Sequence, residues 1–136
     1  MVGIVRQIYD RFLAASVGWD VIHWLATGVM LWWGVVLFLP GNTMSVSPSY
    51  DIFLSLANEQ VWGVFFISSG VFGLWAVFSK TTEVRIVAAM LLSVMHGMVA
   101  TLLVLGNPFN TGTGTYAIIA VAVSLRLWRL VRVAAL

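Results

Sequence analysis

The feature that most constrains this chain is a series of four long apolar runs, separated by short stretches rich in glycine, proline, asparagine and serine. The runs cover residues 17–39, 61–78, 84–105 and 115–134. A helix crosses the hydrocarbon core of a bilayer, about 30 Å, with roughly 20 such residues. Because 61% of the 136 residues are hydrophobic and 9% are charged, the chain holds more apolar surface than a water-soluble domain of this length can bury. The sequence predicts an all-α integral membrane four-helix bundle, a single transmembrane domain over residues 1–136.

The positive charges predict how these helices are oriented. All seven lysines and arginines precede the first run, flank the link between the second and third, or lie in the second half of the fourth. The links 40–60 and 106–114 contain neither residue type. Because cytoplasmic loops carry the excess of Lys and Arg, we expect both termini and the middle link to be cytoplasmic.

Two segments outside the runs have their own character. Residues 1–16 place apolar side chains mostly on one helical face, which predicts a short N-terminal interfacial helix. A cleaved signal peptide is disfavoured, because the following apolar run is too long and has no small-residue cleavage pattern behind it. Within the link 40–60 we expect a short helix on the outer surface, whose side chains Ile52, Phe53 and Leu56 dock on the lipid interface or on a partner.

Polar residues inside the runs are the candidate functional residues, because an ionisable group in hydrocarbon is costly. Asp20, His23 and Thr27 lie at i, i+3 and i+7, on one face of the first helix. This polar face predicts an interhelical hydrogen-bond seam, with a proton or ion path as the alternative. His96 lies near the middle of the third run, and we interpret it as a neutral, hydrogen-bonded packing residue rather than a ligand or a switch.

The depth of Arg126 predicts an ion pair. In a fourth helix that crosses fully, Arg126 lies too deep for its side chain to reach the cytoplasmic head groups easily. Asp20 lies near the cytoplasmic end of the first helix, within reach of such an arginine. A pair would spare the protein two separate charges in lipid. The alternative is that the fourth helix ends early, with the arginines among head groups and Asp20 at the interface.

Cofactor and enzyme chemistry finds little support in the sequence. His23 and His96 could ligate one haem iron, but their depths differ by roughly 9 Å at the helical rise, whereas axial ligands must reach the same iron. The chain has no cysteine, so it cannot form a thiolate metal site. It also lacks the P-loop, the dinucleotide fingerprint and the HExxH and GxSxG motifs. We therefore expect no catalytic residue, no metal and no cofactor.

The basic end of the fourth run is expected to meet anionic lipid head groups rather than nucleic acid.

Small residues recur along three of the predicted helices and allow close helix approach. The third run carries small residues at every fourth position: Ala89, Ser93, Gly97 and Thr101. The second run carries the pair Ser69 and Gly73. The fourth run carries Ala117, Ala120 and Ser124. Each set can pack within one bundle, which is the simpler interpretation, or join copies of the chain into a homo-oligomer.

The first two runs also carry a recurrent pattern of turns and tryptophans. A Leu-Pro-Gly turn stands at 39–41 after Trp32 and Trp33, a Ser-Pro-aromatic step at 47–50, and a Trp-Gly pair at 62–63. This pattern resembles that of small membrane proteins of tailed bacteriophages, often described as holin-like.

The resemblance implies a multi-pass protein of the bacterial host inner membrane that forms a pore or lesion in host cell lysis, without catalytic residues. Two alternatives stay open: an accessory or structural membrane subunit of a larger complex, and a phage exclusion factor that binds a host membrane protein.

Overall fold

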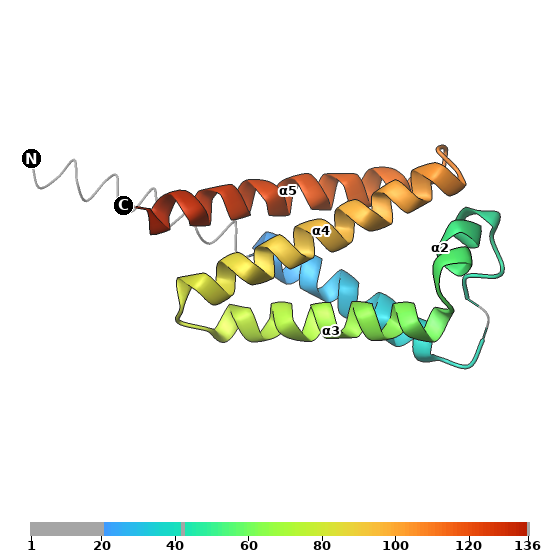
Figure 1. Cartoon of the computed structure of the whole chain (residues 1–136), viewed down its shortest axis with the longest axis horizontal. Coiled ribbons are helices and arrows are strands. Elements are labelled where there is room, and N and C mark those ends of the chain that lie inside the picture. The colour runs from blue at the N-terminus through green and yellow to red at the C-terminus, as the bar shows by residue number, and fades with distance from the viewer. Residues whose placement is uncertain (1–20, 42, 136) are drawn as a thin grey trace, which may run out of the picture.

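The computed structural model describes residues 21–41 and 43–135, and this part of the chain is helical apart from turns and links. In chain order, the elements are the helix Val21–Phe38, η1 (Pro48–Tyr50), α2 (Asp51–Leu56), α3 (Glu59–Phe78), α4 (Thr82–Gly106) and α5 (Thr111–Ala134). Figure 1 shows α4 between α5 and α3. The α3–α4 turn lies at the same end as the C-terminus of α5, and α2 lies at the opposite end.

The prediction of an all-helical chain with helices suited to a membrane is confirmed at this coarse level. Three helices are long and apolar enough to cross a membrane: Val21–Phe38, Glu59–Phe78 and Thr82–Gly106. The 24-residue α5 is as long as these helices, but it carries three arginines in its second half. The predicted interfacial helix at residues 1–16 and the start of the first run lie outside the described residues.

Three helices begin earlier than the apolar runs that predicted them: α3 at Glu59, α4 at Thr82 and α5 at Thr111. An asparagine caps α3 and α5. The side chain of Asn58 accepts a hydrogen bond from the backbone N–H of Val61 at 2.9 Å, and Asn110 caps α5 in the same way. Polar first turns are invisible to a hydropathy pattern, although capping residues mark them.

Glycines let the Val21–Phe38 helix pack closely against α3. A Cβ atom on Gly34 would lie 2.4 Å from Cγ1 of Ile67 and 2.7 Å from its backbone nitrogen. A Cβ atom on Gly70 would likewise lie 2.6 Å from Cγ of Leu31. Real Cβ atoms essentially never lie this close to another heavy atom, so the two helices can approach this closely only through glycine.

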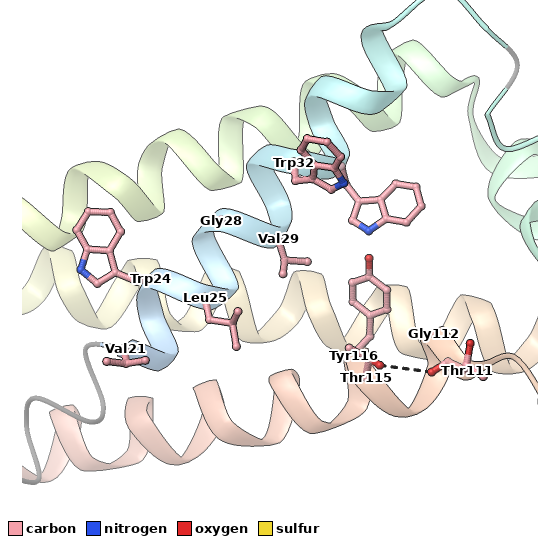
Figure 2. Close-up of a pocket in the computed structure, with 11 residues that line it drawn as sticks. Val21, Trp24, Leu25, Gly28, Val29, Trp32, Thr111, Gly112, Thr115 and Tyr116 are labelled. Carbon is pink, nitrogen blue, oxygen red and sulfur yellow. Dashed lines mark hydrogen bonds between the residues drawn. The ribbon is translucent and has the colours of Figure 1, made fainter.

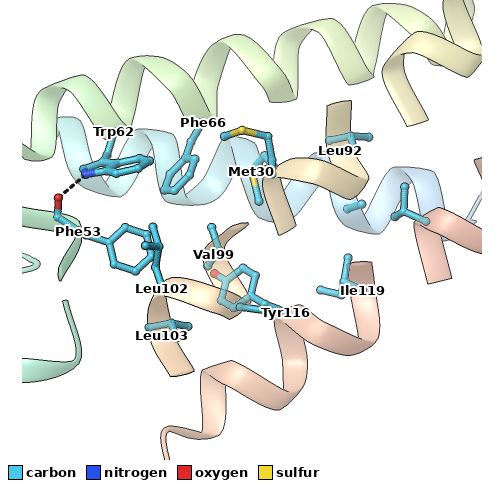
Figure 3. Packing of buried hydrophobic residues seen from close by; sticks show 14 of the residues in the cluster. Met30, Phe53, Trp62, Phe66, Leu92, Val99, Leu102, Leu103, Tyr116 and Ile119 are labelled. Carbon is cyan, nitrogen blue, oxygen red and sulfur yellow. Dashed lines mark hydrogen bonds between the residues drawn. The ribbon is translucent and has the colours of Figure 1, made fainter. Parts of the chain in front are cut away.

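The core lies where these helices meet α4 and α5 (Figure 3). Its fully buried apolar side chains come from several elements and include Met30, Leu37, Phe53, Leu92, Leu103 and Val123. Such a shared core requires each of these elements to be in place for the others to bury their apolar faces.

The link between the first helix and α3 folds back over one end of the molecule. The indole Nε1 of Trp62 donates to the backbone carbonyl of Phe53 at 2.9 Å, and their rings meet edge to face (Figure 3). The Glu59 carboxylate accepts hydrogen bonds from the backbone N–H groups of Thr43 and Met44. The short helix was expected to dock on lipid or a partner, but Phe53 is buried against its own chain.

Candidate functional site at a buried polar junction

A buried histidine joins three helices at one polar junction. His23, on the Val21–Phe38 helix, is 1% exposed, and Arg126 of α5 is 4% exposed. Nη1 of Arg126 lies 2.8 Å from Nδ1 of His23, and Nε2 of His23 lies 2.9 Å from the carbonyl oxygen of Gly73 in α3. We call His23, Arg126 and the Gly73 carbonyl the polar junction.

The partners of His23 define its protonation state. A guanidinium can only donate, so Nδ1 of His23 must accept the hydrogen bond from Arg126. The Gly73 carbonyl can only accept, so Nε2 of His23 must carry the hydrogen. His23 is therefore the neutral Nε2–H tautomer. Both of its nitrogens are engaged, which leaves no lone pair for a metal ion.

Gly73 is required at the junction for steric reasons. A Cβ atom at this position would lie 2.6 Å from Oγ1 of Thr27, which lies one turn along the helix from His23. Thr27 is itself buried, and its hydroxyl has no hydrogen-bond partner among the described residues. Ser69, one turn before Gly73, donates to a carbonyl of its own helix. The predicted pair Ser69 and Gly73 thus lies in the packed interior of the molecule.

His96 is buried in α4 with different partners from those of His23. Its Nδ1 lies 2.8 Å from the carbonyl oxygen of Leu92, so it donates to its own helix. Its Nε2 has no partner in the part of the chain that the structure describes. The imidazole centroid lies 6.0 Å from that of the Tyr116 ring. The described residues hold no group of three or more His, Cys, Asp or Glu side chains that could bind a metal ion.

The predicted ion partner of Arg126, Asp20, lies outside the described residues. Sequence reasoning placed Arg126 deep in the fourth helix but did not pair it with His23. The signal was available, because Asp20 and His23 share a helical face and an arginine can reach either. The Arg126 guanidinium is buried among the helices rather than exposed at the surface.

The small-residue stripe of α4 divides into two halves. Ala89 is buried, and the Ser93 hydroxyl forms a hydrogen bond with that of Ser124 on α5. A Cβ atom on Gly97 would meet nothing within 4 Å. Thr101 is exposed and donates to the carbonyl of Gly97 at 2.8 Å. One half of the stripe therefore packs within the molecule, and the other half faces outward.

The lysine and most arginines of the described residues lie toward one end of the molecule. The α3–α4 turn, which carries Lys80 and leads to Arg85, lies at the same end as the C-terminal half of α5, with Arg129 and Arg132 (Figure 1). The links at the opposite end contain no lysine or arginine.

A groove of about 780 Å³ separates the Val21–Phe38 helix from the first half of α5 (Figure 2). Its lining is mainly apolar and includes Trp24, Gly28, Trp32 and Trp33 on one side and Thr115 and Tyr116 on the other. Trp32 is 68% exposed, so the groove is open to the surroundings. None of its lining residues within the described part of the chain is charged, which suits contact with hydrocarbon.

The polar junction acts chemically as an internal link between helices. The two hydrogen bonds of His23 hold the Val21–Phe38 helix, α3 and α5 together. Comparison with family models, with curated proteins and with solved structures finds no match to this chain.

Proposed function

We propose that this chain crosses a bacterial inner membrane four times, with α5 as the fourth crossing and both termini in the cytoplasm. The charge division between the two ends supports this orientation, because positive residues are retained on the cytoplasmic side. Burial of Arg126 within the molecule supports α5 as a crossing, since the helix does not present this charge to lipid.

Within the membrane, the protein acts by lateral self-association, as a holin-like pore or lesion former in host lysis does. The observation that carries this proposal is the outward half of the α4 stripe. Gly97 has open space where a side chain would stand, and Thr101 beside it is exposed. Small residues on an outward helix face allow the helix of another copy to approach closely.

The polar junction contains polar side chains that can face water in such an assembly. His23, Thr27 and Arg126 are buried in the single chain. A lesion needs polar side chains along its lining, and these three are spread over two helices that would have to separate. Association through α4 that loosens the contact between α5 and the first helix would expose them.

Regulated expression in a bacterium tests this function. Membrane potential and culture density are followed after induction, and an abrupt loss of potential after a delay is expected for the natural sequence. Gly97→Leu should shift or abolish this event by blocking helix approach. Gly28→Leu is the matched control, because a Cβ atom on Gly28 also meets nothing within 4 Å but lies on another helix. Cells that tolerate high levels of the natural chain indefinitely would contradict the proposal.

A second candidate function is that of an accessory membrane subunit of a larger complex. A phage exclusion factor would likewise act by binding a host membrane protein. The internal engagement of His23 favours an accessory subunit, because the resting bundle is closed and already satisfies this polar group. This function predicts stable expression without loss of potential and co-purification of one membrane protein at a fixed ratio.

A further inference from the structure

A shallow groove of about 430 Å³ runs along the second half of α5. Its lining residues are Val121, Ser124, Leu125 and Trp128. They lie at i, i+3, i+4 and i+7, on one face of the helix. Val121, Leu125 and Trp128 are each more than half exposed, whereas Ser124 bonds to Ser93 of α4 at the edge of this face. We call it the α5 groove.

An arginine stands at the end of the α5 groove. Cζ of Arg132, one turn beyond Trp128, lies 4.2 Å from the centroid of the indole ring. This cation–π contact engages no carboxylate, so the N–H donors of Arg132 stay available to another acceptor. Arg132 is exposed and makes no hydrogen bond or ion pair with another residue of the described chain. Since α5 contains no Asp or Glu, no acid on this helix competes for these donors.

The groove and the arginine together have the dimensions of one lipid leaflet. Arg132 follows Val121 by 132 − 121 = 11 residues. At about 1.5 Å per residue this is roughly 16 Å, close to half of the hydrocarbon thickness of about 30 Å. A chain that starts at Arg132 and follows the groove would end near the middle of the bilayer.

We propose that the α5 groove binds one anionic phospholipid of the cytoplasmic leaflet. The phosphate accepts hydrogen bonds from Arg132, and an acyl chain lies along Trp128, Leu125 and Val121. Arg129, one turn before Arg132, adds positive charge at the same end. The planar guanidinium of Arg132 matches the geometry of a phosphate, and its positive charge favours a head group with a net negative charge. The leaflet assignment rests on the proposed orientation of the chain.

Native mass spectrometry of the full chain in detergent tests this site. The protein is titrated with phosphatidylglycerol and, separately, with phosphatidylcholine of the same acyl chains. One phosphatidylglycerol should remain bound at concentrations where phosphatidylcholine is lost. Arg132→Gln should weaken phosphatidylglycerol binding about fivefold, the effect of one cation near an anionic surface. Trp128→Leu should also weaken it, because the indole positions the guanidinium.

Lys80→Gln is the matched control, since it removes one exposed cation at the same end of the molecule without touching the α5 groove. Helical content and thermal unfolding of each variant are measured alongside. Equal binding of the two lipids, or an equal loss for Lys80→Gln and Arg132→Gln, would overturn the proposal. Displacement of the lipid by glycerol phosphate at similar concentration would assign the site to phosphate alone. Lipid retention in detergent does not depend on lesion formation, so the two proposals fail separately.

Discussion

At the scale of single residues, the stability of the molecule depends on how its buried polar atoms are paired. His23 satisfies both ring nitrogens with partners from two other helices, whereas the Thr27 hydroxyl one turn away has none among the described residues. A buried hydrogen bond adds modestly to the free energy of unfolding, whereas a buried polar group without a partner lowers it by more. The two residues should therefore respond in opposite ways to truncation.

We predict that His23→Ala and Arg126→Gln each lower the stability of the protein by about 1–3 kcal/mol, because each leaves a buried partner with a lost hydrogen bond. Their combined loss should be smaller than the sum of the single losses, since both remove the same contact. Thermal unfolding in detergent measures all four members of this cycle. Thr27→Val should cost nothing or stabilise the protein. Additive losses would show that the two residues do not interact.

At the scale of elements, the closeness of the first helix and α3 depends on glycine at defined positions. We predict that Gly34→Ala destabilises the protein by about 1–3 kcal/mol, because its Cβ atom meets the backbone of Ile67 and the helices must separate. Gly28→Ala on the same helix should be neutral or slightly stabilising, since its Cβ atom meets nothing within 4 Å. Unfolding temperatures of the two variants provide the comparison. Equal changes in unfolding temperature would mean that the helix propensity of alanine, and not the contact between the two helices, determines the effect.

The same elements show what a sequence can and cannot predict. Hydropathy located the long helices, because burial in lipid needs only length and apolar content. It missed the starts of α3 and α5, where Asn58 and Asn110 cap polar first turns. Helical spacing placed His23 and Thr27 on one face. It also brought Arg126 to this face of the first helix through Asp20, but it could not select His23 as the partner, because that choice depends on how two helices distant in the chain cross.

At the scale of the whole molecule, orientation follows from charges gathered at one end. We predict that reporter fusions after Ser79 and after Leu136 behave as cytoplasmic, and that fusions after Ser45 and Thr111 behave as external. Alkaline phosphatase and a fluorescent protein, which are active on opposite sides of the membrane, are the paired reporters. External reporters after both Thr111 and Leu136 would remove α5 as a crossing, and the leaflet assigned to the α5 groove would fail with it.

The contacts of Glu59, in the link between the first helix and α3, and the contact of Arg126 at the polar junction can form at different times during synthesis. Glu59 bonds to Thr43 across 16 residues, so the loop can close while the ribosome is still making α4. Arg126 bonds to His23 across 103 residues, so that contact must wait until this part of α5 has been translated. Until then the first helix and α3 hold a histidine whose Nδ1 lacks its arginine. The polar junction is therefore completed only after α5 has been made, later than the link that Glu59 holds in place.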